Sequence, residues 1–368
     1  MKKRVLVLGA TGSIGSQTID ICRNMKDRFE VCGVAVGKNQ DALNSLCKEF
    51  NCKGTCFATD GIQGIENLIK TSNADIAVNG IAGAAGLKPS VMVLENGIDL
   101  ALANKETVVM AWDVVKEIGK QHNAKIIPVD SEHSAIFNLT QRFGNQNIDE
   151  LVITASGGPF RDFTKEQLEN VTLEMTLNHP TWKMGPKITV DSSSLANKGL
   201  EVIEAARLFG FTTDKIKVVV HPQSLIHSLI RTKDGELYAQ ISAPDMRHPI
   251  FGALIWPEVD YNYLEKFDLF DREMTFYKPR FDAFPLLSYA YDCAAKGNAY
   301  TIAFNAANEE AVYSFLDKKL MYKDIPSVVN EVLQSDWSEK IDCLDTVYSN
   351  DTKARNLAKK AIKQILGE

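Results

Sequence analysis

The first 37 residues contain the feature that most restricts the fold. An apolar run at 4–8 leads into GATGSIG, a helical pattern follows over 14–22, and a second apolar run, VCGVAVG, ends at Gly37. This strand, helix, strand order is typical of a dinucleotide-binding unit. Glycines 9, 12 and 15 permit a tight turn, and they let backbone N–H groups approach a pyrophosphate at a helix N-terminus. We therefore predict a cofactor site here, with a plain glycine-rich turn as the alternative.

The residues after the second apolar run indicate which cofactor is used. A protein that prefers NAD often has Asp or Glu at this position to hold the ribose hydroxyls. This chain has Gly37, Lys38 and Asn39 instead. A cation and an amide suit a 2′-phosphate, so our hypothesis is NADPH over NADH.

The pattern along the chain predicts an α/β fold in several parts. Apolar runs at 75–80, 99–103 and 125–129 alternate with helical segments, which indicates an N-terminal Rossmann-like doubly wound parallel sheet. From 151 the strands LVITAS, VVVHP and ELYAQIS, with a helix starting near Asn197, suggest a central α+β catalytic domain. About four helical stretches close the chain. The expected domains are 1–125 for the cofactor, 126–255 for metal and substrate, a linker at 256–282, and a C-terminal helical domain at 283–368.

Composition argues against several classes of partner. The 368 residues are 45% hydrophobic and 24% charged, with a formal net charge of −6, which disfavours a nonspecific nucleic-acid footprint. No segment approaches the roughly 20 apolar residues of a membrane helix, and the opening apolar run is too short for a signal peptide. Cys47, Cys52 and Cys56 lack the paired spacing of a zinc site, so plain thiols are expected. We expect a cytoplasmic protein without nucleic-acid or membrane partners.

Three carboxylates predict a site for a hard cation. Asp130 and Glu132 follow the strand KIIPV, and positions i and i+2 of an extended chain point to one face. Two carboxylates at a strand end suit Mg²⁺ or Mn²⁺, although D-x-E alone is a weak signal. Glu201 strengthens it, because Asn197, Lys198 and Glu201 fall on neighbouring turns of one helix start.

Phosphate-type donors gather in the middle of the sequence. Ser156 in SGGP, His179 and Ser192 in DSSS supply hydroxyl and imidazole groups suited to a phosphate. The alternative for DSSS is a helix N-cap. His221 and His227 flank VVVHPQSLIHS, where one structural histidine is expected. With the glycine turn and the carboxylates, these groups suggest metal-assisted reduction of a sugar phosphate.

The segment at 178–187 is predicted to be a mobile lid. Trp182 offers a broad apolar face and Met184 an adaptable thioether. Pro180 and Pro186 flank them and are expected to prevent helix formation. A lone Trp is more often part of a core, but these polar, proline-bounded surroundings favour a loop with a function.

Together these segments resemble the 1-deoxy-D-xylulose 5-phosphate reductoisomerases over nearly the whole chain. The resemblance lies in GATGSIG, VGKN, ANKE at 103–106, PVDSEHSAIF, TASGGPF, NHPTWKMG, DSSSLANKGLE, VHPQSLIHS and NAANE at 305–309. It implies cofactor contacts at Thr11, Gly12, Ser13, Ile14, Gly37, Lys38, Asn39, Asn104, Glu106 and Gly185. It implies substrate contacts at Lys105, Ser131, Glu132, Ser156, His179, Ser192, Asn197, Lys198 and Glu201, with catalytic roles for Lys105, Asp130, Glu132 and Glu201. The implied metal ligands are Asp130, Glu132 and Glu201, and the implied lid residues are Trp182 and Met184.

The resemblance also implies an activity. Members of this family use NADPH and a divalent cation, Mg²⁺, Mn²⁺ or Co²⁺, to rearrange and reduce 1-deoxy-D-xylulose 5-phosphate. The product is 2-C-methyl-D-erythritol 4-phosphate, in non-mevalonate isoprenoid precursor synthesis. The family implies a homodimer, and we expect a bacterial cytoplasmic location.

Two other functions are consistent with parts of the sequence. A semialdehyde dehydrogenase could share the glycine turn, but it needs a nucleophilic cysteine in its second domain. After Cys56 only Cys293 and Cys343 remain, both in the predicted helical region. A nonenzymatic NADPH-binding sensor would keep the first domain without the carboxylates and phosphate donors. Cofactor binding without metal-dependent turnover would identify such a sensor.

Overall fold

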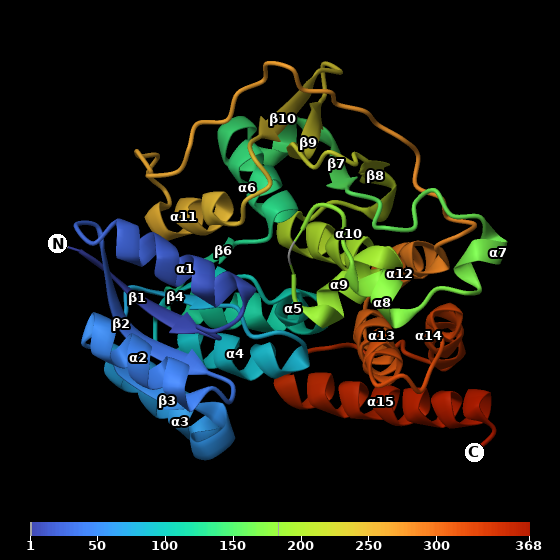
Figure 1. Cartoon of the computed structure of the whole chain (residues 1–368), viewed down its shortest axis with the longest axis horizontal. Helices are drawn as coiled ribbons and strands as arrows, with labels where there is room; N and C mark the ends of the chain where they lie inside the picture. The colour runs from blue at the N-terminus through green and yellow to red at the C-terminus, as the bar shows by residue number, and fades with distance from the viewer. Residues whose placement is uncertain (1, 183) are drawn as a thin grey trace. The chain divides into compact units, whose positions relative to one another are not determined.

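The computed structural model describes residues 2–182 and 184–368 and divides into two compact units (Figure 1). The first unit comprises residues 1–107, 113–134 and 245–268, and the second comprises 108–112, 135–244 and 269–368. Among the described residues, no helix combines the length and apolarity needed to cross a bilayer.

The first unit is built on a six-stranded parallel sheet in the order β3-β2-β1-β4-β5-β6. The strands are β1 (Lys3–Leu8), β2 (Phe29–Val36), β3 (Lys53–Cys56), β4 (Ile76–Asn79), β5 (Asp99–Leu102) and β6 (Ile126–Pro128). This order reverses between β1 and β4, as in doubly wound dinucleotide-binding folds. The predicted Rossmann-like parallel sheet is confirmed.

Apolar runs place the central strands of this sheet in the core. Residues 5–8 of β1 are fully buried, because a parallel sheet covered by helices on both faces leaves neither face to water. The unit's helices are α1 (Ser13–Asn24), α2 (Gln40–Phe50), α3 (Phe57–Ser72), α4 (Leu87–Glu95), α11 (Arg247–Ile255) and most of α5 (Lys105–Gln121), with the short η1 (Ala84–Gly86).

The second unit contains a four-stranded mixed sheet in the order β10-β9-β7-β8. The strands are β7 (Ile148–Ala155), β8 (Ile216–Val220), β9 (Ile226–Thr232) and β10 (Leu237–Ile241). β7 pairs with β8 in parallel and with β9 antiparallel. The helical segments before and between these strands are α6 (Ser131–Phe143), which starts in the first unit, η2 (Asn145–Asn147), α7 (Lys165–Leu168), α8 (Leu173–Leu177), α9 (Pro186–Ser193), α10 (Ala196–Phe209) and η3 (Thr213–Lys215). An α+β architecture was expected here.

The end of the chain is helical, as predicted. It forms α12 (Pro285–Lys296), α13 (Tyr300–Leu316), η4 (Tyr322–Asp324), α14 (Ile325–Leu333) and α15 (Leu344–Leu366), drawn in orange to red in Figure 1. α13 is buried along most of its length and belongs to the same hydrophobic core as α10, α12 and α14. A helix that is apolar on nearly every face is stable only when neighbours surround it. Polar side chains on α13 are therefore buried with it.

Candidate functional site

The glycine turn after β1 has the geometry of an anion-binding loop. Gly9 has φ +81°, and a Cβ atom on Gly15 would lie 2.2 Å from the carbonyl oxygen of Gly9. Gly12 is the N-cap of α1 and has no side chain to satisfy the first N–H groups of the helix. Those N–H groups, together with the helix dipole, favour a phosphate. Thr11, Gly12 and Ser13 are exposed at this turn, and Ile14 is half-buried.

The residues after β2 are open to solvent. Gly37, Lys38 and Asn39 are all exposed, and a Cβ atom on Gly37 would meet nothing within 4 Å. Asn39 also caps α2, because its Oδ1 accepts a hydrogen bond of 3.0 Å from the Ala42 amide. The side-chain amide nitrogen of Asn39 and the ammonium group of Lys38 are the donors that this loop could offer to a 2′-phosphate.

Asn104 organises the start of α5. Its Oδ1 caps the helix by accepting from the Thr107 amide at 2.9 Å, and its Nδ2 donates to Ile81 O at 2.8 Å and to Glu106 Oε2 at 2.9 Å. Asn104 and Glu106 are both buried, so these hydrogen bonds form in a low-dielectric environment. The network fixes the loop after β4 against α5.

Asp130 and Glu132 are not an extended pair, which corrects the reasoning from the sequence. β6 ends at Pro128, and α6 begins at Ser131, so Glu132 lies in the first helical turn. The helix begins here because Asp130 O accepts the Ser134 amide at 2.7 Å. The side chain of Ser131 donates to Glu132 Oε2 at 2.6 Å.

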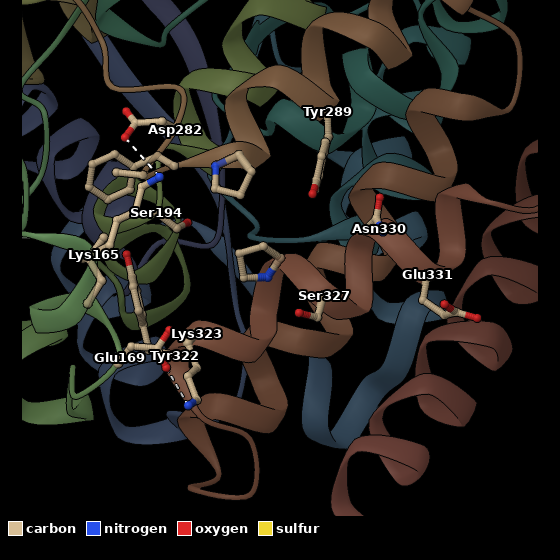
Figure 2. A pocket seen from close by; sticks show the side chains of 15 residues that line it. Lys165, Glu169, Ser194, Asp282, Tyr289, Tyr322, Lys323, Ser327, Asn330 and Glu331 are labelled. Atoms are coloured by element: carbon tan, nitrogen blue, oxygen red, sulfur yellow. Dashed lines mark hydrogen bonds and ion pairs between the residues drawn. The ribbon is translucent and has the colours of Figure 1, made fainter.

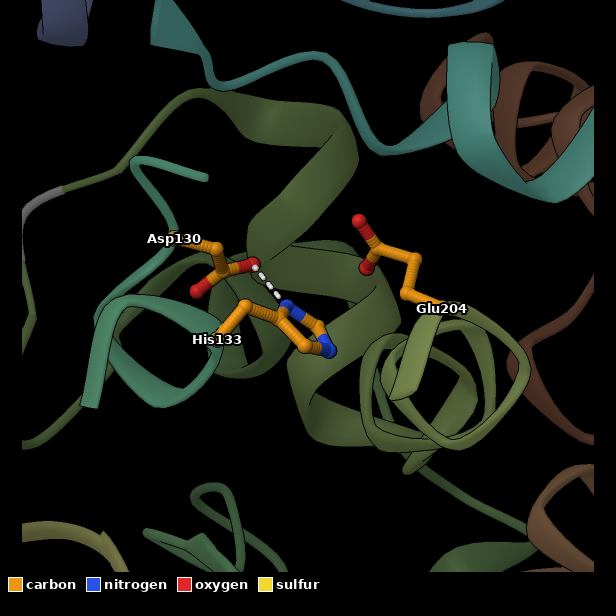
Figure 3. Close-up of side chains that lie close together, drawn as sticks. All are labelled: Asp130, His133 and Glu204. Atoms are coloured by element: carbon orange, nitrogen blue, oxygen red, sulfur yellow. Dashed lines mark ion pairs between the residues drawn. The ribbon is translucent and has the colours of Figure 1, made fainter. Parts of the chain in front are cut away.

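A buried cation and an imidazole contact Asp130. Lys105, from the start of α5, forms an ion pair with the Asp130 carboxylate. His133 Nδ1 lies 4.0 Å from Asp130 Oδ2, as Figure 3 shows for these two side chains. Lys105 is buried and His133 is fully buried. Sequence reasoning assigned no role to His133, although its i+3 spacing from Asp130 on a helix start could have indicated this contact.

In the second unit the three predicted phosphate donors converge. His179 Nε2 lies 3.3 Å from Ser156 Oγ and 3.1 Å from Ser192 Oγ. Ser156 lies in the loop after β7, His179 lies in the loop after α8, and Ser192 lies on α9. A phosphate accepts hydrogen bonds only, so two hydroxyls around one imidazole N–H form a suitable donor set.

Backbone contacts define the tautomer of His179. Its Nδ1 accepts hydrogen bonds from the amides of Thr181 at 3.1 Å and Trp182 at 2.9 Å. Nδ1 is therefore unprotonated, and Nε2 has the hydrogen. Burial, and then the nearby positive charge of Arg161, lower the pKa of His179 to about 4. At neutral pH His179 is a neutral donor that points Nε2–H at the two serines.

The start of α10 holds a buried carboxylate. Asn197 Nδ2 donates to Glu201 Oε1 at 2.5 Å, and Lys198 Nζ donates to Glu201 Oε2. Glu201 is 1% exposed and Lys198 4%. These three side chains therefore lie together at the start of α10. Burial of both charges is tolerated because they are paired and hydrogen-bonded.

The predicted lid contains an unexpected helix boundary. Pro186 does not prevent a helix; it occupies the first position of α9, where its missing N–H has no partner to lose. Trp182 and Met184 lie before it, outside any helix, and Lys183 lies outside the described residues. The Trp182 ring packs edge-on against His227 with centroids 6.3 Å apart.

The DSSS run is not a helix N-cap region. Asp191, Ser192 and Ser193 form the last turn of α9, and α10 is capped by Leu195 in the left-handed conformation with φ 58°. His221 is the expected structural histidine, because its Nδ1 contacts Thr275 O at 3.0 Å and its Nε2 accepts the Leu225 amide at 3.1 Å.

A cavity of about 510 Å³ lies elsewhere in the second unit (Figure 2). Its wall includes ion pairs of Lys165 with Asp282 at 3.4 Å and of Lys323 with Glu169 at 2.6 Å. None of the predicted site residues lines it. This cavity is therefore distinct from the convergent donors around His179.

Family models match most of the chain. One described as 1-deoxy-D-xylulose 5-phosphate reductoisomerase matches residues 5–60 and 51–112, and its C-terminal domain model matches 126–209. A model described as the DXP reductoisomerase C-terminal domain matches 241–357.

Full-length relatives and solved structures are similar to this chain. The 1-deoxy-D-xylulose 5-phosphate reductoisomerase of Treponema denticola is 46% identical, covering 97% of this chain and 96% of its own length. That of Clostridium perfringens is 43% identical, with 96% and 98% covered. A crystal structure of DOX-P reductoisomerase with NADPH, fosmidomycin and magnesium is 33% identical, with a TM-score of 0.90 over 99% of both chains. The Zymomonas mobilis enzyme with NADPH is 34% identical, with a TM-score of 0.90 over 99% of this chain and 100% of its own.

Proposed function

The chain belongs to the 1-deoxy-D-xylulose 5-phosphate reductoisomerase family, and from this premise we propose that it converts 1-deoxy-D-xylulose 5-phosphate to 2-C-methyl-D-erythritol 4-phosphate. The reaction is an NADPH- and divalent-metal-dependent rearrangement and reduction in non-mevalonate isoprenoid precursor synthesis. The observation that best supports it beyond similarity is the convergence of Ser156, His179 and Ser192 on one point suited to a phosphate.

The first unit fits NADPH. A Cβ atom on Gly15 would overlap the backbone of Gly9, so α1 packs tightly on the glycine turn. The first N–H groups of α1 have no side-chain cap and are suited to the cofactor phosphates. We propose that the cofactor phosphates bind at residues 11–14, the 2′-phosphate at 37–39, and the rest of the cofactor at Asn104, Glu106 and Gly185. NADPH supplies the hydride for the reduction.

The carboxylates fit a hard divalent cation. Carboxylate oxygens are the ligands that hard divalent cations prefer, and Glu201 is held in place by Asn197 and Lys198. We propose that Asp130, Glu132 and Glu201 hold Mg²⁺, with Mn²⁺ or Co²⁺ as substitutes. When bound, such a cation polarises a ketone and stabilises charge that develops on oxygen.

The remaining predicted residues would hold and enclose the substrate. The Nε2–H of His179 and the hydroxyls of Ser156 and Ser192 donate to the phosphate. Ser131, Lys105, Asn197 and Lys198 contact the other substrate oxygens. Closure of the segment around Trp182 and Met184 would exclude water while the skeleton rearranges and the aldehyde accepts hydride.

We further propose the domain roles expected from the sequence. Residues 1–125 bind the cofactor, 126–255 bind metal and substrate with a lid at 178–187, 256–282 connect, and 283–368 form a helical domain. The protein acts as a homodimer in the bacterial cytoplasm. Exposed apolar side chains in the second unit, Leu237, Ile241, Leu269 and Phe270, are consistent with an interface.

A steady-state assay tests the proposal. NADPH absorbance is followed with 1-deoxy-D-xylulose 5-phosphate, with and without Mg²⁺. Turnover should require the metal, stop on chelation, and be much slower with NADH. Lys38→Ala should weaken the binding of NADPH far more than the binding of NADH. An equal loss of affinity for both cofactors would contradict the proposed contact of Lys38 with the 2′-phosphate. If the folded protein binds NADPH but does not turn over the substrate, the alternative function as a nonenzymatic NADPH-binding sensor would be favoured.

A further inference from the structure

The NAANE motif lies on α13 and contacts the last turn of α9. Asn308 is fully buried, and its Nδ2 donates to Asp191 Oδ1 at 2.8 Å. The other carboxylate oxygen of Asp191 lies 2.9 Å from Lys187 Nζ, one turn earlier on α9. Asp191 is 1% exposed, so this pairing forms out of contact with water. The residue before Ser192 is therefore tied to the C-terminal helices.

A second buried hydrogen bond holds the residue after Ser192. The hydroxyl of Tyr322, on η4, donates to Ser193 O at 2.9 Å. Burial raises the pKa of Tyr322, so the phenol keeps its proton and remains a donor. The Tyr322 ring lines the cavity in Figure 2, with Ser194 among its neighbours there. Ser192 thus lies between two residues that are each anchored to the helices at the end of the chain.

These anchors add to the packing that holds α9, a short helix. α9 has eight residues, and the last carbonyls of a helix have no partners within it, so short helices fray at their ends. Ser192 Oγ must stay 3.1 Å from His179 Nε2 to form the donor set. A side chain held in its bound position before the ligand arrives binds more tightly, because less freedom is lost on binding.

We propose that Asn308 and Tyr322 are positioning residues for the substrate phosphate. They fix the last turn of α9 through Asp191 and Ser193, and thereby fix the hydroxyl of Ser192 beside His179. This inference rests on the proposed function, because it assumes that Ser156, His179 and Ser192 receive a phosphate. It gives the C-terminal helices a part in substrate binding without direct contact with the substrate.

Two variants with matched controls test this role. Tyr322→Phe removes one hydroxyl group. Its control is Tyr291→Phe, because the hydroxyl of Tyr291, on α12, also donates a hydrogen bond to a backbone carbonyl, that of Ile216, at 3.0 Å. Asn308→Ala has Asn350→Ala as its control, since Asn350 is 2% exposed and donates to Glu339 Oε2 at 2.8 Å.

The readouts are the inhibition constant of inorganic phosphate, the KM for the substrate, kcat, and the NADPH dissociation constant. Tyr322→Phe and Asn308→Ala should each raise the phosphate inhibition constant and the KM by up to about tenfold. NADPH binding should stay constant, and kcat should change less than the KM. The two controls should lower thermal stability to a similar degree and leave phosphate inhibition unchanged.

The outcomes separate the inference from the function on which it rests. If the variants and their controls lose stability alike and none changes phosphate inhibition, the positioning role is wrong while the proposed function stands. If wild type shows no metal-dependent turnover, the proposed function itself fails. Should Asn308→Ala not fold, Tyr322→Phe, which keeps the ring, decides the question alone.

Discussion

His179 shows how one residue's surroundings set its chemistry. Two backbone amides donate to Nδ1, so only Nε2 can be a donor. Protonating Nδ1 would break both hydrogen bonds as well as place a charge in a partly buried position. The imidazole of the protein alone is therefore neutral at neutral pH, and its contribution is directional hydrogen bonding.

The low pKa predicts a pH dependence of stability. The unfolded histidine titrates near 6.5 and the folded one near 4, so between these values the unfolded state binds more protons. The stabilisation is fully present above about pH 6.5 and is lost as the pH falls toward 4. Wild type should therefore lose more free energy of unfolding than His179→Gln between about pH 7 and about pH 5, measured by urea unfolding. His122→Gln, which replaces an exposed histidine, should lose as much free energy of unfolding over this pH range as wild type. If His179→Gln also loses as much as wild type, the lowered pKa of His179 is refuted.

Glu201 is the most demanding test of the proposed metal ligands. Glu201→Gln removes the charge that pairs with Lys198 in a buried position, and it removes a proposed cation ligand. We expect kcat to fall by about two orders of magnitude or more, with NADPH affinity unchanged in a fluorescence titration. Glu150→Gln, which instead breaks a 3.0 Å pair with Arg231 on the sheet, should keep its activity. Loss of cofactor affinity in Glu201→Gln would argue against a metal role.

At the scale of elements, the turn between β1 and α1 depends on Gly15. Gly15→Ala would place a methyl group 2.2 Å from Gly9 O, so the backbone must shift. We expect a loss of about 1–3 kcal/mol in the free energy of unfolding, together with weaker NADPH binding. In Gly252→Ala, on α11, the added methyl group would meet nothing within 4 Å. This change should raise the free energy of unfolding by about 0.5–1 kcal/mol. Equal effects of the two changes in urea unfolding would show that the turn is not tightly packed.

The segment around Trp182 should act as a cover for the site. Its first residues are anchored by His179, while its indole contacts only the edge of His227 among the ring pairs of the described residues. Trp182→Ala should lower kcat/KM by up to about a hundredfold, because a loosely held substrate rarely reaches the reactive geometry. Trp182→Phe should retain more activity, since it keeps an aromatic face. Wild-type kinetics in Trp182→Ala would exclude a lid role.

The sequence predicted strands wherever apolar runs were long. It located β1, β2, β4 to β8 and β10, but not β3, whose four residues KGTC form a short edge strand without an apolar run. It also missed β9, where two polar residues and Arg231 interrupt a buried strand. The expectation that Pro186 prevents a helix was wrong, because proline disrupts the interior of a helix but is favoured in its first turn. The sequence alone does not show which of these positions a proline occupies.

The site itself was only partly predictable. The residue types at Ser156, His179 and Ser192 indicated a phosphate, but their convergence depends on three separate elements that no local spacing connects. The roles of Lys105 and Ser131 came from the family resemblance. The buried hydrogen bonds of Asn308 and Tyr322 join segments more than a hundred residues apart, and a single sequence does not reveal such contacts.

At the scale of the whole molecule, the chain combines one unit suited to a dinucleotide with another that holds phosphate donors and a buried carboxylate. The central claim is that this combination both rearranges a carbon skeleton and reduces it. Consumption of NADPH alone does not show the rearrangement, because direct reduction of the ketone would also consume it. The structure of the product therefore decides.

The most direct test is the proton NMR spectrum of the product formed from 1-deoxy-D-xylulose 5-phosphate, NADPH and Mg²⁺. Rearrangement places the methyl group on a carbon without hydrogen, so our account predicts a methyl singlet, identical to that of authentic 2-C-methyl-D-erythritol 4-phosphate. Direct reduction of the ketone would instead add a hydrogen to the carbon that bears the methyl group, and that hydrogen would split the methyl signal into a doublet. A doublet, or unchanged substrate with folded and NADPH-bound protein, would contradict the proposed function.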